Sequence, residues 1–376
     1  MSESKKTIPK RRFKEFENAD AWEQRKLGKE VQITMGQSPD GSSYTDIPSD
    51  YILVQGNADI KNGWVMPRVW TSQVTKKAEA GDLIMSVRAP AGEMGKTAYN
   101  AVIGRGVAAI KGNEFIFQSL VKMNFEGYWK RLSCGSTFES LNSDNIKNAE
   151  IMIPHLKEQL LIGSFFENLD NLITLHQRKA DKLIALKSAY LIEMFPSEGE
   201  TKPKRRFKGF NDDWELRKLW EIVDVRGGKD YKHLSEGDIP VYGTGGYMLS
   251  VNEALSYKED AIGIGRKGTI DKPYILKAPF WTVDTLFYAV PRENYDLNFV
   301  FDLFQNIDWK KKDESTGVPS LSKTAINEID VIVPKENEQK VVGAYFTRID
   351  NLITLHQRKV DKLLNMKKAY LNEIFV

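Results

Sequence analysis

The sequence has few of the side chains from which metal centres and disulfides are built. Cys134 is the only cysteine, which excludes an internal disulfide and a zinc cluster held by thiolates. The four histidines do not pair at the spacing of metal ligands; they are His155, His176, His233 and His356. We therefore expect no metal bound by this chain.

Long apolar runs are also lacking. No stretch approaches 18 consecutive apolar residues, so no membrane span is expected. The basic residues near the N-terminus are not followed by an apolar segment, so a secretory signal is not expected either, and we predict a cytoplasmic protein. The formal net charge is only +3, so any binding to nucleic acid must depend on local basic clusters.

The motifs of common active sites are missing too. Gly263, Gly265 and Gly268 have the spacing of a dinucleotide loop, but the segment that follows them contains a proline and does not have the pattern of a helix. We find no Asp/Asn-Pro-Pro-Tyr/Phe tetrapeptide, which an adenine methyltransferase would carry. We predict no catalytic residue and no cofactor bound by this chain.

The chain does contain a long internal repeat. The stretch DNLITLHQRK occurs at residues 170–179 and again, unchanged, at residues 350–359, inside matching blocks 151–195 and 331–375. Two shorter segments, PKRRF and W-E-x-R-K-L, also occur twice, at residues 9–13 and 203–207 and at residues 22–27 and 214–219. A period of this length is too large for a solenoid and predicts two domains, each followed by a long helix.

The pattern within each repeat predicts an α+β fold. Short alternating segments such as GDLIMSVRAP at residues 81–90 indicate strands, and residues 117–132 and 298–311 have helical spacing. A linker rich in proline, glycine and charge follows the first long helix. The expected boundaries are 1–154 for the first domain, 155–195 for the first long helix, 196–212 for the linker, 213–334 for the second domain and 335–376 for the second long helix.

Heptads of apolar residues continue through both long helices, at about 1.5 Å per residue over roughly 50 Å. The order domain, helix, domain, helix predicts an antiparallel coiled coil. An amphipathic helix packed only on its own domain is the alternative, but it does not explain the same seam in both copies. We expect His176 and His356, which lie near the middle of the two helices, to lie near a pseudo-two-fold axis that relates the helices. The expected seam consists of Leu169, Leu172, His176, Leu183, Ile349, Leu352, His356 and Leu363.

Basic side chains cluster in the glycine-rich turns of both domains, together with Tyr, Ser and Thr. Arg and Lys can contact phosphate or guanine edges, and hydroxyl groups position the DNA backbone. Each charge alone is more often simply solvated, but their clustering favours DNA binding. The candidates are Arg88, Lys96, Arg105, Arg131, Ser136, Thr137, Lys229, Tyr242, Thr244, Arg266, Lys267, Lys311, Ser315 and Thr316. The PKRRF segments could contact phosphate or form solvated tails.

Together these segments resemble the specificity subunit of type I restriction-modification systems. The resemblance covers essentially the whole chain and depends on the order of the blocks, which occurs twice. The blocks are the two W-E-x-R-K-L segments, GDLIMSVR, IGRKG with FWTVDT after it, the Ser-Thr loops before residues 141 and 321, the P-x-x-x-E-Q starts of the helices at residues 154–159 and 334–339, and LDNLI and IDNLI.

The resemblance implies two target recognition domains separated by an antiparallel pair of long helices. It also implies binding to an asymmetric, bipartite target in double-stranded DNA. The partners would be two methyltransferase subunits, which use S-adenosylmethionine, and restriction/translocase subunits, which use ATP and Mg. The chain itself would be non-catalytic. We expect the methyltransferase subunits on the apolar helix positions Ile173, Leu175, Ala180, Ile353, Leu355 and Val360.

Two alternatives belong to other classes. A non-catalytic coiled-coil scaffold would show no salt-sensitive DNA binding in the presence of its partners. A fused restriction and methylation enzyme would carry its own methyltransferase and nuclease motifs, and we find neither in the sequence.

Overall fold

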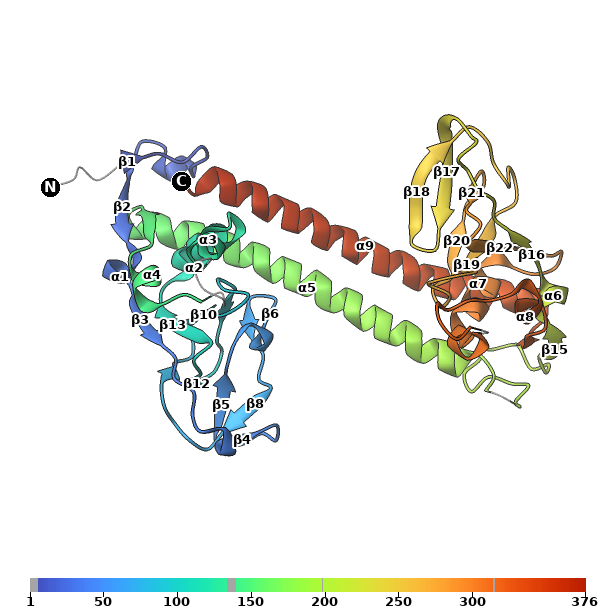
Figure 1. The fold of residues 1–376 in the computed structure, drawn as a ribbon, viewed down its shortest axis with the longest axis horizontal. Helices are drawn as coiled ribbons and strands as arrows, with labels where there is room; N and C mark the ends of the chain where they lie inside the picture. The colour runs from blue at the N-terminus through green and yellow to red at the C-terminus, as the bar shows by residue number, and fades with distance from the viewer. Residues whose placement is uncertain (1–5, 134–139, 198, 314) are drawn as a thin grey trace. The chain divides into compact units, whose positions relative to one another are not determined.

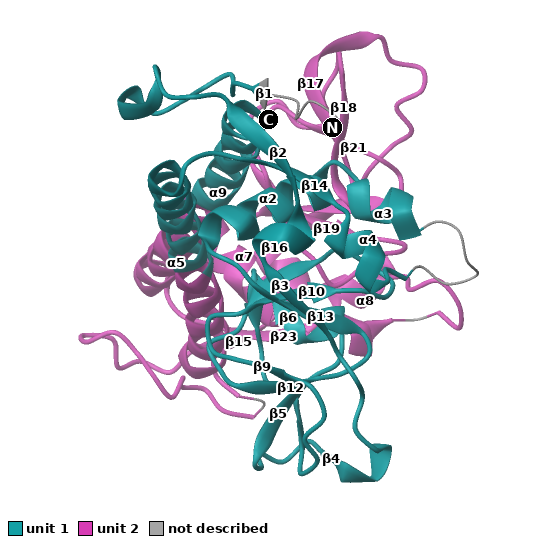
Figure 2. Ribbon diagram, turned by 90° about the vertical axis from the view of Figure 1, so that its left-hand side faces the viewer, with its two compact units in different colours: residues 1–177, 358–376 teal, residues 178–357 magenta. Residues whose placement is uncertain are grey.

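The computed structural model describes residues 6–133, 140–197, 199–313 and 315–376 (Figure 1). The chain forms two compact units, unit 1 with residues 1–177 and 358–376 and unit 2 with residues 178–357 (Figure 2). Each unit therefore contains one β-rich domain together with a segment of each long helix. The predicted α+β fold with two domains and two long helices is confirmed.

The described residues of unit 1 form three sheets, with strand orders β1-β2-β14, β3-β13-β10-β11-β7-β6 and β4-β8-β5-β12-β9. The strands are β1 Lys6–Thr7, β2 Trp22–Lys26, β3 Gln32–Met35, β4 Tyr44–Thr45, β5 Tyr51–Val54, β6 Ile60–Lys61, β7 Trp64–Val65, β8 Val69–Thr71, β9 Lys77–Ala78, β10 Leu83–Ser86, β11 Met94–Lys96, β12 Ala101–Ile103, β13 Val107–Lys111 and β14 Glu150–Ile153. The short helices are η1 Lys14–Phe16, α1 Leu27–Glu30, η2 Gly41–Ser43, η3 Asn57–Asp59, α2 Glu114–Phe125, α3 Tyr128–Ser133 and α4 Ser143–Lys147.

In unit 2, outside residues 198 and 314, the strands also form three sheets, with orders β15-β23, β16-β22-β19-β20 and β18-β17-β21. The strands are β15 Glu215–Lys218, β16 Val223–Gly227, β17 Glu236–Gly243, β18 Gly246–Val251, β19 Ala261–Gly265, β20 Tyr274–Leu276, β21 Trp281–Thr282, β22 Leu286–Pro291 and β23 Asp330–Val333. The short helices are α6 Leu219–Ile222, α7 Leu297–Asn306, η4 Trp309–Lys312 and α8 Lys323–Asn327.

The two domains share a framework of seven strands. The antiparallel order β3-β13-β10-β11 in unit 1 matches β16-β22-β19-β20 in unit 2. In the second sheets, β8-β5-β12 matches β18-β17-β21, each with one antiparallel and one parallel pair. The domains differ most in the connection between the antiparallel pair of the second sheet, which is β5 and β8 in unit 1 and β17 and β18 in unit 2. Residues 55–68, with β6 and β7, connect β5 to β8, whereas β17 turns directly into β18 through Thr244 and Gly245.

The long helices are α5 Leu156–Met194 and α9 Glu336–Ile374, each with 39 residues. Segments of the two helices pair in an antiparallel sense within each unit. In unit 1, Lys367 Nζ lies 2.7 Å from Asp170 Oδ1. In unit 2, Lys187 Nζ lies 2.6 Å from Asp350 Oδ2. Both aspartates are the first residue of the repeated DNLITLHQRK, so the repeat supplies the same cross-helix ion pair twice.

The buried side of each helix differs from the expected seam. Leu169 and Ile349 are buried and Leu183 and Leu363 are half-buried, but Leu172 and Leu352 are 46% and 41% exposed. The most buried rows keep Leu169 and Ile349 of the expected seam but continue through Ile162 and Phe166 in α5 and Val342 and Phe346 in α9. These rows face the apolar cores of the two domains, so each helix buries a side rotated away from the Leu172 and Leu352 positions.

Part of the expected docking side is wrong for the same reason. Ala180, Ile353 and Val360 are buried, whereas Leu175 and Leu355 remain about half exposed. His176 and His356 are half-buried and belong to different units. Their placement near a pseudo-two-fold axis stays a prediction.

The end of each long helix completes the core of a domain. In unit 1, Phe375 stacks on Phe115 of α2 with ring centroids 5.1 Å apart. In unit 2, Phe195 stacks on Phe299 of α7 at 5.5 Å. The tryptophan of each W-E-x-R-K-L segment, Trp22 or Trp214, packs edge-on against the same phenylalanine. The repeated aromatic residues therefore close two equivalent cores.

The single helices expected at residues 117–132 and 298–311 are each broken. Gly127, with φ of 72°, separates α2 from α3, and Ile307 adopts extended backbone angles between α7 and η4. The break lets a buried tryptophan fold back on the first helix. Trp129 Nε1 donates to the Leu120 carbonyl at 3.3 Å, and Trp309 Nε1 donates to the Phe304 carbonyl at 2.7 Å.

We predict that Gly343→Ala destabilises unit 2. A Cβ at residue 343 would lie 2.6 Å from the Phe299 backbone nitrogen and 2.6 Å from Asp296 Oδ1, where α7 begins against α9. Overpacking of this kind costs about 1–3 kcal/mol, more than the roughly 1 kcal/mol that alanine gains over glycine in a helix. Urea unfolding measures the loss. The control is Gly227→Ala, whose Cβ would meet nothing within 4 Å; equal effects of the two variants would contradict the prediction.

A second prediction concerns Asp302, a buried carboxyl on α7. Burial raises the pKa of Asp302 well above its usual range, and the Asp350 carboxylate raises it further, although Lys187 opposes this. Because the pKa of Asp302 is higher in the folded state than in the unfolded state, the protonated carboxyl favours folding. This contribution to stability is fully present below the unfolded pKa and is lost as pH rises through the folded-state pKa. At pH 8 we expect the free energy of unfolding of Asp302→Asn, measured by urea unfolding, to exceed that of wild type by about 1–2 kcal/mol. The gain should be smaller at pH 5.

In unit 1, Gln118 on α2 lies next to Asp170, the repeat of Asp350, and its amide donates to Asp170 Oδ2 at 2.8 Å. This contact shows that an amide can be accommodated next to the repeated aspartate, as Asp302→Asn would require in unit 2. The exposed Asp308→Asn is the matched control for Asp302→Asn. The pH dependence attributed to Asp302 is refuted if both variants change stability equally at the two pH values.

Candidate nucleic-acid interface

One basic side chain in each unit follows a core strand and occupies an equivalent position on the backbone. In unit 1, Arg88 follows β10 and forms an isolated bridge with Ser140. In unit 2, Lys267 follows β19 and forms the matching bridge with Ser320. Both side chains are exposed. The neighbouring Arg266 is also exposed, and its guanidinium lies over the Phe287 ring, 5.7 Å from the centroid.

A second group of cations follows each buried tryptophan. Lys130 and Arg131 follow Trp129 on α3, and Lys310 and Lys311 follow Trp309 on η4. Arg131 Nη1 donates to the Glu126 carbonyl at 2.7 Å. Lys311 lies 3.4 Å from Asp308 and is largely exposed. Anchoring the tryptophan therefore presents two consecutive cations at the surface of each domain.

The hairpin β17–β18 carries Tyr242 and Thr244. Tyr274 Oη donates to the Gly243 carbonyl at 2.6 Å, and the Tyr242 ring packs against both Tyr247 and Tyr274. These contacts hold the tip of the hairpin, where Tyr247 is 63% exposed. Lys229 is exposed on the loop before β17, and its carbonyl accepts from Trp281 Nε1 at 2.8 Å.

The loop that leads to α8 is held by one carboxylate. Asp313 Oδ1 accepts from the backbone nitrogen atoms of Ser315 and Ser320 and from the Ser315 hydroxyl, at 2.9–3.0 Å. These hydrogen bonds lower the pKa of Asp313. Thr316 is exposed at the tip of this loop, whereas Ser315 is half-buried. The corresponding candidates of the first domain, Ser136 and Thr137, lie outside the described residues.

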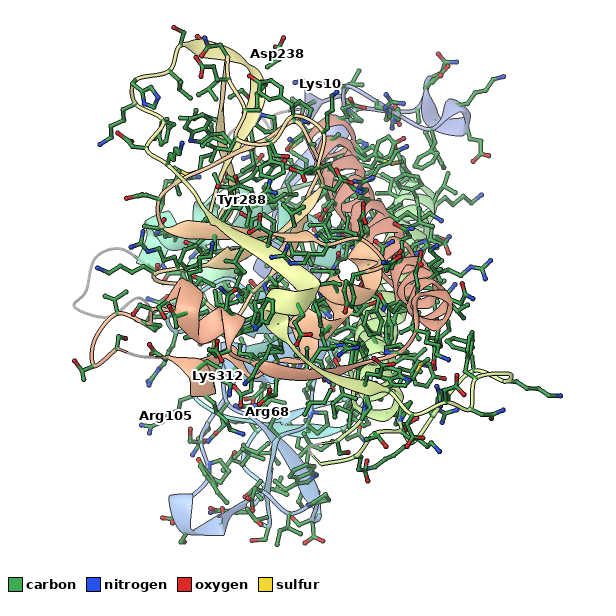
Figure 3. All side chains as sticks on the ribbon, turned by 90° about the vertical axis from the view of Figure 1, so that its right-hand side faces the viewer. Lys10, Arg68, Arg105, Asp238, Tyr288 and Lys312 are labelled. Atoms are coloured by element: carbon green, nitrogen blue, oxygen red, sulfur yellow. The ribbon has the colours of Figure 1, made fainter. Side chains whose placement is uncertain are left out.

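Lys96 is not available for DNA, contrary to the sequence prediction. Its Nζ lies 2.7 Å from Glu114 Oε2 and lies over the rings of Trp64 and Phe117. Its side chain is 12% exposed. Arg105, in contrast, is exposed in the turn between β12 and β13 and is labelled in Figure 3, where its side chain extends away from the strands.

The second arginine of each PKRRF segment forms an ion pair with a buried carboxylate and is not available for phosphate. Arg12 pairs with Glu158 and Arg206 pairs with Glu338, each with two nitrogen-oxygen distances of 2.7 Å. The carboxylates are 1% and 3% exposed. The hydrogen bond to Glu158 raises the pKa of Arg12. Both partners are repeated residues in the sequence, and the simultaneous repetition of an arginine and a glutamate is the signal from which this pair could have been predicted.

The neighbouring glutamine of each helix start has an equivalent role. Gln159 Nε2 donates to the Pro154 carbonyl at 3.0 Å and its Oε1 accepts from Asn113 before α2. Gln339 Nε2 donates to the Pro334 carbonyl at 2.9 Å and its Oε1 accepts from the Asp296 backbone nitrogen before α7. The Glu-Gln pair therefore ties each long helix to its domain.

Across the described ranges we find neither a cluster of three or more potential metal ligands nor a helix long and apolar enough to cross a membrane.

Comparisons with known proteins agree with this architecture. The family model described as the type I restriction modification DNA specificity domain matches residues 20–185 and again residues 211–365. A putative type I restriction enzyme MjaX specificity subunit from Methanocaldococcus jannaschii is 30% identical over 172 residues, which cover 43% of this chain and 40% of that relative. The MjaVIII specificity subunit from the same organism is 24% identical over 69% of this chain and 68% of its own.

A solved structure has the same fold. The crystal structure of a type I restriction-modification S subunit from M. genitalium superposes with a TM-score of 0.77 at 18% identity, covering 98% of this chain and 99% of that chain. The two matches to the family model cover most of the sequence and fall on the two halves of the internal repeat. This chain therefore belongs to the type I restriction-modification DNA specificity family.

Proposed function

We propose that this chain reads two different half-sites of a bipartite DNA target, one with each domain, and directs partner subunits to that target. The observation that carries the proposal is the combination of a shared strand framework with different connections: residues 55–68 in unit 1 and the tight β17–β18 turn in unit 2. Different surface elements on one framework favour an asymmetric target. The domain boundaries expected from the sequence remain part of this proposal.

Two linked domains solve a problem of specificity. Each correct base pair contributes roughly 1–3 kcal/mol, so a half-site of a few base pairs discriminates poorly within a genome. When two domains are joined, binding to the second half-site becomes intramolecular, and the gain depends on the spacing between the half-sites. The long helices supply that spacing, so the proposed target contains a spacer that is not read.

The hairpin β17–β18 is the proposed base-reading element of the second domain. A two-stranded ribbon fits into the major groove of DNA, where hydroxyl groups can bond to base edges and apolar groups can contact the thymine methyl group. Thr244 lies at the turn, and Tyr247 is exposed next to it. In the first domain, Arg105 is the proposed base or phosphate contact.

The exposed leucines of the helices are the proposed docking surfaces for two methyltransferase subunits. Unit 1 exposes Leu172 and Leu175, and unit 2 exposes their repeats Leu352 and Leu355, each between 41% and 46%. Two copies of one apolar surface suit two copies of one partner. These subunits would supply S-adenosylmethionine and flip the target adenine out of the stack. Restriction/translocase subunits would supply ATP and Mg chemistry in the cytoplasm.

The docking proposal predicts a change in stoichiometry. A charge at the centre of an apolar contact must lose its water when the partner binds, and this costs free energy. Leu175→Glu or Leu355→Glu should therefore each remove one methyltransferase subunit, and the double variant should remove both. Native mass spectrometry of the reconstituted complex counts the subunits. Leu216→Glu, at an exposed leucine on β15, is the control. Complexes that keep two methyltransferase subunits in all variants would rule out these surfaces.

The reading of two half-sites predicts an asymmetric methylation motif. Long-read methylation mapping of cells that carry this chain and its partners should return two different half-sites separated by a spacer. Thr244→Ala with Tyr247→Ala should relax only one half-site, by about 1–3 kcal/mol for each base pair that is no longer read. A palindromic motif, or relaxation of both half-sites, contradicts the proposal. Absence of salt-sensitive DNA binding would favour the scaffold alternative.

A further inference from the structure

The backbone frame around Arg88 is reproduced around Lys267 by the same hydrogen bonds. In unit 1, the Val87 nitrogen donates to the Gly106 carbonyl at 2.8 Å, and the Leu141 nitrogen donates to the Val87 carbonyl at 2.8 Å. In unit 2, the Arg266 nitrogen donates to the Thr285 carbonyl at 2.8 Å, and the Leu321 nitrogen donates to the Arg266 carbonyl at 2.9 Å. The residue that follows, Arg88 or Lys267, therefore occupies an equivalent position in each domain.

The surroundings of the frame are not reproduced. The residue before the cation is buried Val87 in unit 1 and exposed Arg266 in unit 2. The turn that supplies the accepting carbonyl is Gly-Arg-Gly at residues 104–106 in unit 1 and Val-Asp-Thr at residues 283–285 in unit 2. What the two frames keep in common is their geometry and one exposed positive charge.

Within the part of the chain that the structure describes, that charge has no carboxylate partner. No aspartate or glutamate of the parts that the structure describes forms an ion pair with Arg88 or Lys267, whereas Lys96, Arg12 and Arg206 are all paired. The guanidinium of Arg88 and the ammonium of Lys267 differ in shape and in the number of donors. An exchange between them preserves charge but does not preserve a planar, bidentate contact.

We propose that Arg88 and Lys267 are phosphate anchors that contact the DNA backbone at equivalent places in the two half-sites and carry no base specificity. The inference rests on the proposed function. Two half-sites with different bases still share the same sugar-phosphate backbone, so equivalent cations on an equivalent frame match the feature that the half-sites share. The anchors fix the position of each domain on the duplex, and the divergent connections next to the frame read the bases.

The test uses the complex reconstituted with its methyltransferase partners. The variants are Arg88→Gln, Lys267→Gln and the double variant, and the controls are Lys29→Gln in unit 1 and Lys258→Gln in unit 2, both exposed lysines outside the proposed base-reading connections. Binding to the target duplex and to an unrelated duplex is measured across a salt series, from low to above physiological concentration. Native mass spectrometry confirms that each variant assembles.

Removal of one phosphate contact reduces the slope of log affinity against log salt by about 0.9. We expect this reduction for each single variant and twice this for the double variant, with affinity about threefold to tenfold weaker at low salt for both duplexes. The methylated sequence should stay the same. Arg88→Lys and Lys267→Arg should keep near wild-type slopes, because they keep the charge.

Three results would overturn the inference. Slopes no different from those of the lysine controls would mean that the frame only holds the loop. A changed or relaxed base in the methylation motif would mean that these side chains read bases. Failure of the wild-type complex to prefer its target would remove the proposed function itself, which is distinguishable because the first two results require a wild-type complex that binds specifically.

Discussion

The fold depends on a register between antiparallel helix segments that one ion pair sets in each unit. Lys367 meets Asp170 in unit 1, and Lys187 meets Asp350 in unit 2, at 2.6–2.7 Å. Lys187 is 8% exposed but the Asp350 side chain is 35% exposed, so the pair is partly buried, and removing Asp350 leaves the buried lysine without a partner for its charge. A shifted register would do the same. Buried ion pairs contribute little net stability but can select one arrangement among several, and we interpret this pair in that way. The aspartate that begins each DNLITLHQRK stretch and its lysine partner are therefore both kept in the two copies.

The same register brings the ends of the helices into the domain cores. Phe375 can stack on Phe115, and Phe195 on Phe299, only when each helix ends at the level of α2 or α7. The buried pairs of Arg12 with Glu158 and of Arg206 with Glu338 then hold the PKRRF segments across the starts of the long helices. Each domain is thus assembled from segments that are far apart in the sequence. Gly343 permits the close approach of α7 to α9, because no Cβ separates their backbones.

Much of this fold could be predicted from sequence because duplication reveals equivalence directly. The long helices, the strands before Pro154 and Pro334 and the two domains all follow from repeated blocks and local patterns. The buried side of the helices could not be predicted. A heptad pattern shows that a helix has an apolar side, but it does not show whether a partner helix or a domain core packs on that side. Leu172 is exposed for this reason, and Phe166 is buried. The availability of Lys96 could not be predicted either, because tertiary packing brings Glu114 to it, and the number of basic residues in a turn does not reveal such a partner.

The two domains can diverge in their connections while keeping the same backbone hydrogen bonds around Arg88 and Lys267. The frame that positions Arg88 and Lys267 consists of backbone hydrogen bonds, which do not depend on the side chains around them. Substitutions in the connection between β5 and β8, or in the β17–β18 turn, change the exposed chemistry without moving that frame. A base-reading surface attached to a rigid framework at one side can therefore vary freely, since loops tolerate change better than the strands that carry them. In the proposed mode of DNA reading, specificity and positioning are separated in this way, and a new half-site would require a new connection rather than a new domain.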